Sequence, residues 1–459
     1  MQEVSPGARE YRPNGPSVVI LGGGFGGLHA ARALRHAPVR VTLVDRRNHH
    51  LFQPLLYQVA TAALNPSDIA SPIRGMLRSQ RNVSVVLAEA ISVHVGAKRV
   101  ILADGAIAYD YLIVSTGATH SYFDHDAWAT HAPGLKSIED ALEIRRRVFV
   151  AYETAERETD PGRRRDWMTF VIIGAGPTGV EMAGALAEIS RHALDRDFRN
   201  IDPRRARIVL VEALPRVLPT TYPAELSAKA RRQLERLGVE VRTDARVTEI
   251  DEAGVSLLGV SLLRERRIGA RTVIWAAGVA ASPLARSLGA PLDRAGRVLV
   301  NPDLTVPGRD DIFVIGDLAA LVQDARPIPG VASAAIQEGR HAAGNIVRAL
   351  HGEPCLPFRY RDKGSFATIG RGAAVGELLG GFQLSGFLAW LAWLVVHIYF
   401  LMGFRNRLLV MFHWAYSYLT YRRGARLITG LTRPRMLEAP EGERARPSKD
   451  PAFRGSGDL

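Results

Sequence analysis

Two glycine-rich turns, each between an apolar run and a helical pattern, constrain the fold of this chain most. The first lies in "VVILGGGFGGLHAARAL", where the spacing Gly-x-Gly-x-x-Gly falls on Gly22, Gly24 and Gly27. In this spacing the first glycine permits a tight turn, the second admits a pyrophosphate to the backbone, and the third lets the helix pack on the strand. A second apolar run, "VRVTLVD", ends in Asp45, where a carboxylate accepts hydrogen bonds from ribose hydroxyls. All of these features together predict a dinucleotide site.

The pattern recurs in the middle of the chain. "FVIIGAGPTGVEMAGALAEI" carries Gly174, Gly176 and Gly179, and "RIVLVEALPRVL" supplies Glu212 at the end of the following strand. An acid at that position favours the free 2′-hydroxyl of NADH and repels the 2′-phosphate of NADPH. Arg216 lies nearby and would soften this preference. The two units predict an α/β protein with two Rossmann-like dinucleotide-binding domains.

Three later fragments indicate how the two units are used. "YDYLIVSTGA" and "RTVIWAAGVA" each end an apolar strand in a small-residue turn, and "DDIFVIGDLAAL" places Asp317 after a further strand. This arrangement resembles the two-dinucleotide-binding-domain flavoproteins of the glutathione-reductase-like fold, which implies FAD in the first unit and NADH in the second. The implied FAD contacts are Gly22, Gly24, Gly27, Asp45, Gln53, Thr116, Gly117, Asp317 and Ala332, and the implied NADH contacts are Gly174, Gly176, Gly179, Glu212 and Gly278.

The number of cysteines limits the redox and metal chemistry that the chain can carry out. Cys355 is the only cysteine in 459 residues, so the chain can form neither an internal disulfide nor a cysteine cluster for metal. Disulfide reductases and sulfide:quinone oxidoreductases, whose chemistry needs cysteines, are therefore excluded, and we expect no metal site. The net charge of +13 suits anionic lipid or phosphorylated ligands, and without a nucleic-acid-binding signature we expect no nucleic-acid partner.

Longer stretches carry a narrower resemblance. "RNHHLFQPLLYQVATAALNPSDIASPIR", "GPTGVEMAGALAE", "KGSFATIGRGAAV" and "FRNRLLV" together resemble the type II NADH:quinone oxidoreductases, single-subunit alternative NADH dehydrogenases. The resemblance implies FAD-dependent transfer of electrons from NADH to a membrane quinone without proton pumping. It also implies residence at the cytoplasmic face of the inner membrane, peripheral or monotopic, on anionic lipid. The type of quinone and a homodimer are left open.

Particular residues acquire roles from this resemblance. Glu181, two residues after the last glycine of the second turn, is expected beside the nicotinamide and flavin as a catalytic carboxylate; the plain alternative is a helix-capping acid. The quinone-side helix typically begins AQxAxQE, whereas here it reads "ASAAIQE". Ser333 thus replaces the first Gln, while Gln337 remains as an expected catalytic and quinone contact. Lys363 is a further quinone candidate, with a solvated lysine as the alternative.

Two rival functions share the nucleotide signals. One is a soluble-type flavin reductase that feeds an iron–sulfur carrier, and the other is a non-catalytic, NADH-responsive flavoprotein. Glu181 and the intact second glycine turn argue against the second rival. The first rival would not need the apolar segment near the end of the chain, which is uncharged over residues 378–404.

That segment predicts membrane attachment. Its densest apolar run, Phe387 to Met402, is 16 residues long, short of the ~20 residues that a membrane-crossing helix needs. Arg405 and Arg407 follow, and then a second apolar-aromatic stretch, "LLVMFHWAYSYLTY". We predict a helical pair, with one helix packed on the flavin domains and the other in the membrane interface. A single span and a buried core helix remain alternatives.

The expected division of the chain follows. It comprises a disordered N-terminus at 1–16, an FAD-binding domain at 17–135 and 286–371, an NADH-binding domain at 136–285, a C-terminal helical membrane-association region at 372–432, and a disordered tail at 433–459.

Overall fold

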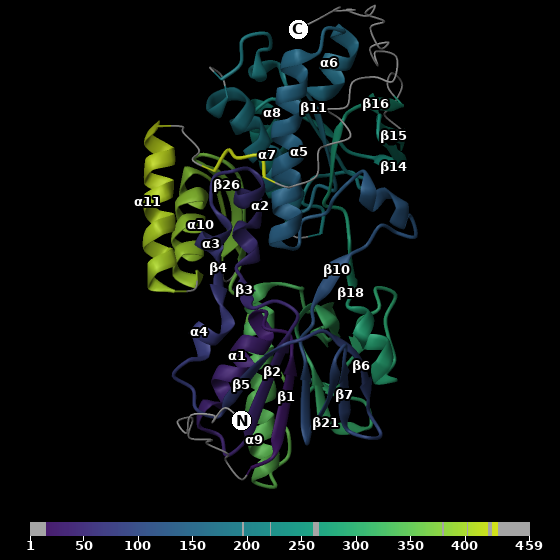
Figure 1. Cartoon of the computed structure of the whole chain (residues 1–459), viewed down its shortest axis with the longest axis vertical. Helices are drawn as coiled ribbons and strands as arrows, with labels where there is room; N and C mark the ends of the chain where they lie inside the picture. Colours follow the sequence, from purple (N-terminus) through teal and green to yellow (C-terminus); the bar gives the residue numbers. More distant parts are fainter. Residues whose placement is uncertain are drawn as a thin grey trace, which may run out of the picture.

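The computed structural model describes residues 15–194, 197–220, 222–259, 266–378, 381–401, 403–420 and 425–429. The disorder expected at the two ends concerns residues almost wholly outside these ranges, and Met402 of the apolar run also lies outside them. Figure 1 shows an elongated molecule with the first glycine unit at one end and the second at the other. Two C-terminal helices, α10 (Phe387–Phe400) and α11 (Phe404–Thr420), stand along one side.

The first unit is built on a six-stranded sheet with the order β20-β21-β9-β1-β2-β5, in which only β20 runs antiparallel to its neighbour. Its central strand is buried on both faces, because two helices cover one face and an antiparallel meander covers the other. The bounds are β1 (Ser17–Leu21), β2 (Arg40–Asp45), β5 (Val83–Leu87), β9 (Tyr111–Val114), β20 (Thr305–Val306), β21 (Arg309–Val314), helices α1 (Phe25–Ala33) and α9 (Ala332–Leu350), and meander β6 (Ala90–His94), β7 (Arg99–Leu102) and β8 (Gly105–Ala108).

The second unit repeats this plan with a four-stranded parallel sheet in the order β13-β12-β11-β17. Alternate residues of β11 face the helices and a second antiparallel meander, so this strand too is wholly buried. The bounds are β11 (Thr169–Ile173), β12 (Arg207–Val211), β13 (Val239–Arg242), β17 (Thr272–Trp275), helices α5 (Ile138–Arg157), α6 (Pro161–Trp167), α7 (Pro177–Glu188) and α8 (Ala224–Arg236), and meander β14 (Ala245–Asp251), β15 (Gly254–Gly259) and β16 (Arg267–Gly269).

Short elements join the two units. A two-stranded antiparallel crossing of β10 with β18 connects them, and α2 packs on α5 within the core of the second unit. Their bounds, with those of the remaining short strands and helices, are β3 (His49–Leu51), α2 (Leu56–Ala60), α3 (Pro66–Ile69), β4 (Ala70–Pro72), α4 (Ile73–Leu77), β10 (Ala118–His120), β18 (Val279–Ala281), β19 (Val298–Leu299), β22 (Ala319–Ala320), β23 (Val322–Gln323) and β24 (Arg326–Pro327).

The C-terminal region begins as a sheet. Strands β25 (Ser365–Gly370), β26 (Ala373–Leu378) and β27 (Phe382–Gly386) form an antiparallel sheet ahead of α10 and α11. Of these, β26 and β27 lie within the region 372–432 that we expected to be helical. Helix α7 lies directly on β25. A Cβ atom on Gly184 would stand 1.7 Å from the carbonyl oxygen of Ile369, so this close contact requires glycine.

Helices α10 and α11 each bury one side and expose the other. Trp393 of α10 and Trp414 of α11 stack on each other at 5.3 Å and are 1% and 4% exposed, within the core that includes α2, α5 and α7. We expected one helix to pack on the protein and the other to lie in the membrane interface; both helices pack on the protein through these tryptophans. Among the described residues, no helix has both the length and the apolar character needed to cross a membrane.

Candidate active site

The two glycine turns have the same backbone geometry. Gly22 and Gly174 adopt φ values of +100° and +98°, which residues with a side chain rarely reach. A Cβ atom on Gly27 would lie 1.9 Å from the Gly22 carbonyl oxygen, and one on Gly179 would lie 1.8 Å from that of Gly174. The first and third glycines of each turn are thus fixed by the fold itself.

The acids at the strand ends also hold the turns. Asp45 Oδ2 accepts a hydrogen bond from the Gly23 backbone N–H at 2.6 Å, and its Oδ1 accepts one from the N–H of Arg47. Glu212 does the same in the second unit, with Oε2 accepting from the Ala175 N–H at 2.7 Å and Oε1 from that of Leu214. The motif places these acids correctly but does not reveal their second task of bracing the glycine turns.

The residues present fit two dinucleotides. A Cβ atom on Gly24 or Gly176 would meet no protein atom within 4 Å, so the outer side of each turn is open to a ligand. At the end of β9, the Thr116 hydroxyl is buried and has no hydrogen-bond partner among the described residues, while Gly117 adopts a φ of +66°. An open cradle beside an orphaned buried hydroxyl is the arrangement that a bound cofactor completes.

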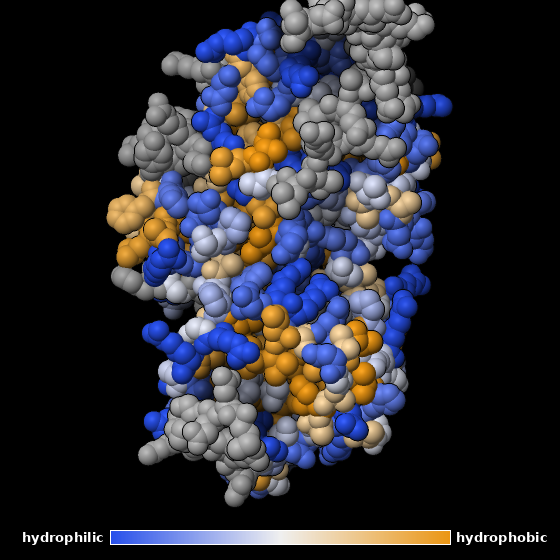
Figure 2. Space-filling model, in the orientation of Figure 1, coloured by the Kyte–Doolittle hydropathy of each residue, from blue (hydrophilic) through white to orange (hydrophobic). Residues whose placement is uncertain are grey.

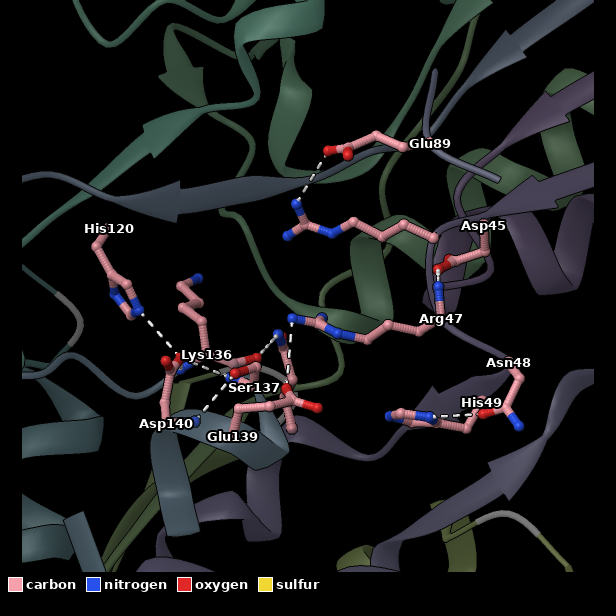
Figure 3. A network of polar contacts seen from close by, with 12 residues as sticks. Asp45, Arg47, Asn48, His49, Glu89, His120, Lys136, Ser137, Glu139 and Asp140 are labelled. Carbon is pink, nitrogen blue, oxygen red and sulfur yellow. Dashed lines mark hydrogen bonds and ion pairs between the residues drawn. The ribbon is translucent and has the colours of Figure 1, made fainter. Parts of the chain in front are cut away.

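A polar network lines the first site, as Figure 3 shows. Lys136 Nζ lies 3.9 Å from Asp317 Oδ2, and the Lys136 carbonyl accepts a hydrogen bond from Gln53 Nε2 at 3.2 Å. Arg47 reaches Glu139 at the start of α5 at 3.7 Å. Gln53 and Asp317, both expected at FAD, are therefore joined through Lys136. Sequence reasoning missed Lys136, because a single basic residue outside a motif carries no signal, and it assigned no role to Arg47, the first residue of the stretch "RNHHLFQPLLYQ".

Helix α9 directs its N-terminus at this site. Ala332, expected at FAD, is its first residue, and Val331 is its N-cap. Glu338, further along the helix and 3% exposed, accepts a hydrogen bond from the Gly316 N–H, next to Asp317. Burial raises the pKa of Glu338 to about 7. This carboxyl therefore fixes the loop that carries Asp317, and its own charge is sensitive near neutral pH.

Glu181 lies where α7 meets β25. Burial raises the pKa of its carboxyl to about 8, although a hydrogen bond with the Thr368 backbone works in the opposite direction. Burial also raises the pKa of nearby Tyr222, and the charge of Glu181 adds to that rise. A carboxyl that is mostly protonated at neutral pH, four residues into a nucleotide-binding helix, is poised for proton exchange. The helix-capping alternative does not fit, because Glu181 lies beyond the first turn of α7.

The expected quinone residues surround the segment that leads into β25. Ser333 Oγ lies 3.0 Å from the Tyr360 hydroxyl. The Gln337 amide donates to the carbonyl oxygens of Ser333 and Arg361 and accepts from the Arg361 N–H, so it ties this segment to α9. Lys363 Nζ sits 5.6 Å from the ring centroid of Phe400, the last residue of α10. Lys363 is exposed, as a solvated lysine would be, and its ammonium group lies near the end of α10.

Gly278, assigned to NADH, has a packing role. A Cβ atom there would lie 2.7 Å from the Phe123 ring, and the Gly278 carbonyl accepts a hydrogen bond from the Ser121 N–H. The residue thus lets the crossing strands approach each other.

Helix α10 presents an apolar stripe to the outside. Phe387, Leu391, Val395 and Tyr399, spaced four residues apart on one side of the helix, are 43% to 68% exposed. Figure 2 shows apolar surface at the edge where α10 and α11 stand. On α11, Met411 and Phe412 are also exposed, and Arg405 is exposed at its start. A contiguous apolar surface next to a basic residue is typical of a lipid-facing site.

Comparisons with known proteins agree with this geometry. A model of the pyridine nucleotide-disulphide oxidoreductase family matches residues 16–339, and a model of the NDH2 C-terminal domain matches residues 363–423. The second match begins just ahead of β25, so the sheet and both helices form one family-specific unit.

Curated relatives and solved structures extend the likeness to nearly the whole chain. The chain is 46% identical to the type II NADH:quinone oxidoreductase Ndh of Mycobacterium tuberculosis over 91% of both proteins. It is 30% identical to the type II NADH:quinone oxidoreductase of Staphylococcus haemolyticus, over 79% of this chain and 90% of that protein. The structure of NDH2 from Plasmodium falciparum in complex with NADH has the same fold, with a TM-score of 0.82 at 21% identity over 89% of this chain and 99% of that one. The chain therefore belongs to the type II NADH:quinone oxidoreductase family.

Proposed function

We propose that the chain transfers electrons from NADH to a membrane quinone through one bound FAD, working from the surface of the membrane. The observation that carries this proposal is the contact of α7 with β25. The helix that begins at the second glycine turn, at Pro177, lies through Gly184 on the sheet of the C-terminal unit. One helix thus connects the expected NADH site with the unit that bears the apolar stripe.

In this proposal the chain's own residues bind the reactants and exchange protons with them. A bound FAD supplies the two-electron chemistry between nicotinamide and quinone. Backbone N–H groups at the start of α9, near Ala332, offer partial positive charge toward the flavin site. The Glu181 carboxyl, with its pKa near 8, holds a proton at neutral pH where α7 meets the C-terminal unit. We assign it the role of orienting the nicotinamide and exchanging protons there.

The quinone headgroup is assigned to the space bounded by α9, the segment leading into β25, and the end of α10. Ser333, Gln337 and Lys363 all border this region. Because the Gln337 amide already makes three hydrogen bonds to protein, its role here is to position residues 361–363. The hydroxyl groups of Ser333 and Tyr360 contact each other, and either could instead donate a hydrogen bond to a quinone oxygen.

The membrane is assigned to the exposed side of α10 and α11. The stripe of Phe387, Leu391, Val395 and Tyr399 would enter the headgroup layer, while the exposed Arg405 would face anionic lipid. Arg407 instead donates hydrogen bonds to the carbonyl oxygens of Tyr399 and Leu401 at the end of α10. We infer a peripheral or monotopic position at the cytoplasmic face of the inner membrane, where NADH would reach α7 from the aqueous side.

Vesicle flotation of the full-length protein tests this placement. Leu391→Glu combined with Val395→Glu introduces two charges into the stripe, whereas Leu258→Glu, at a residue 64% exposed on β15, is the matched control. We expect the double variant to lose binding to vesicles that contain anionic lipid, and to lose reduction of a lipid-soluble quinone. It should still reduce ferricyanide with NADH at the unmodified rate. Undiminished vesicle binding by the double variant would contradict the placement.

A further inference from the structure

Helix α10 carries one ionisable side chain on its inward face. His397 follows the buried Trp393 by one helical turn, and their rings stack with centroids 4.4 Å apart. On its other side, the His397 ring meets Phe52 edge-on at 6.2 Å. Phe52 in turn meets Phe25, the residue directly after Gly24 in the first glycine turn, at 5.9 Å. His397 thus lies between the lipid-facing stripe and the expected FAD site.

The tautomer of this histidine is set by its helix. His397 Nδ1 lies 2.7 Å from the carbonyl oxygen of Trp393. A carbonyl only accepts, so Nδ1 must carry the hydrogen of this bond. Burial lowers the pKa of His397 to about 4, so the ring is neutral at physiological pH. A neutral ring with hydrogen on Nδ1 presents a bare lone pair at Nε2.

Within the described part of the chain, the hydrogen bond of the His397 side chain is the one made by Nδ1, and none reaches Nε2. The neighbouring groups are aromatic rings, together with Lys363 at Phe400, three residues further along α10. A lone pair flanked by the rings of Trp393 and Phe52 suits a planar ring that carries oxygen substituents.

We propose that His397 Nε2 accepts a hydrogen bond from a hydroxyl group of the quinol, and so recognises the reduced form of the electron acceptor. This inference rests on the quinone chemistry proposed above. The carbonyl oxygens of a quinone only accept hydrogen bonds and cannot pair with the lone pair. After two electrons and two protons have been taken up, each oxygen carries a hydrogen and can donate. His397 is therefore a product-binding residue that distinguishes the two redox states.

Removal of the lone pair should weaken the binding of quinol and leave that of quinone almost unchanged. The net value of one hydrogen bond corresponds to a change of roughly five- to ten-fold in the quinol inhibition constant. The KM for the matching quinone should change by less than about two-fold, because the quinone never used the bond.

Three substitutions distinguish the roles of the two nitrogen atoms of the His397 ring. His397→Gln carries an amide oxygen near the position of Nε2, His397→Asn carries an amide nitrogen near that of Nδ1, and His397→Phe removes both polar atoms. In vesicle-bound holoprotein, we would measure the inhibition constant of a short-chain quinol, the KM of its quinone, FAD content and NADH:ferricyanide activity. We expect His397→Phe and His397→Asn to raise the inhibition constant of the quinol. His397→Gln should keep this constant near the value of the unmodified protein.

Two results would overturn the proposal. One is a quinol constant that stays unchanged in His397→Phe while FAD content and ferricyanide activity are retained. The other is restoration by Asn and not by Gln, which would assign His397 a purely structural role through Trp393. If His397→Phe does not fold, the Asn and Gln pair still decides between these outcomes. Failure of the proposed function itself would show earlier, as unmodified protein that does not reduce the short-chain quinone.

Discussion

The Glu212 carboxylate accepts a hydrogen bond from the backbone N–H of Ala175, inside the second glycine turn, at 2.7 Å. Asp45 has the same relationship with Gly23 in the first turn. The acid at the end of each second strand therefore braces the glycine turn, in addition to the ribose contact expected of it. Loss of either acid should affect nucleotide binding in two ways, through charge and through the shape of the turn.

Glu212→Ala is predicted to raise the KM for NADH by about ten-fold, since a hydrogen bond to a charged group is lost from the turn. It should also narrow the preference for NADH over NADPH, because the repulsion of the 2′-phosphate disappears. Steady-state kinetics with both nucleotides measure the two effects. Glu212→Gln, which keeps an acceptor for Ala175, should change the preference but move the KM for NADH less. An unaltered NADH:NADPH ratio in both variants would contradict the ribose assignment.

Glu181→Gln is predicted to slow quinone-dependent turnover by at least about ten-fold while FAD remains bound, because an amide cannot exchange a proton as the carboxyl does. Turnover and FAD absorbance, measured on the same preparation, check this. If turnover is unaltered, Glu181 has no part in the mechanism.

The same variant should also change the pH dependence of stability. The pKa of Glu181 is raised to about 8 in the folded protein, above its ordinary value of 4.5. Its contribution to the free energy of unfolding is therefore fully present below about pH 4.5 and is lost as the pH rises through about 8. Urea unfolding of the unmodified protein should give a lower free energy of unfolding at pH 8 than at pH 5. In Glu181→Gln this fall should be smaller by roughly 1–3 kcal/mol. Parallel pH profiles for the two proteins would mean that the carboxyl is not perturbed.

Gly184→Ala tests the contact of α7 with β25. The new methyl group would stand 1.7 Å from the Ile369 carbonyl oxygen, so the helix and the sheet must separate. We expect a loss of about 3 kcal/mol in the free energy of unfolding, together with slower quinone reduction. Gly344→Ala, on exposed α9 surface where the methyl group meets nothing within 4 Å, is the control and should be neutral or slightly stabilising. Equal stabilities for the two variants would rule out the tight contact.

Gln337→Ala should raise the KM for quinone by a few-fold and leave ferricyanide reduction unchanged. The substitution removes the hydrogen bonds that hold the segment around Arg361, and with it Lys363, against α9. Gln337→Glu keeps the acceptor for the Arg361 N–H but loses both donated bonds, so an intermediate effect is expected. The two KM values, measured with one short-chain quinone, test this order. A normal KM in Gln337→Ala would contradict the positioning role.

Local sequence patterns predicted much of this fold. The two glycine turns, the acids Asp45 and Glu212, and a helical pair in place of a membrane span could all be predicted, because each depends on neighbours along the chain. The bracing bonds of those acids, the Gly184 contact and the Lys363–Phe400 contact could not, because they join residues brought together only by tertiary packing. Strands β25–β27 were missed because their sequence is rich in glycine and small residues.

The most direct test of the account is rapid mixing of the vesicle-bound holoprotein under anaerobic conditions. NADH should bleach the flavin absorbance at once, and a subsequent excess of quinone should restore it at a rate no slower than steady-state turnover. The same restoration should be slowed in Leu391→Glu/Val395→Glu when the quinone is confined to the vesicles. Reduced flavin that persists in the unmodified protein in the presence of excess quinone would contradict the account.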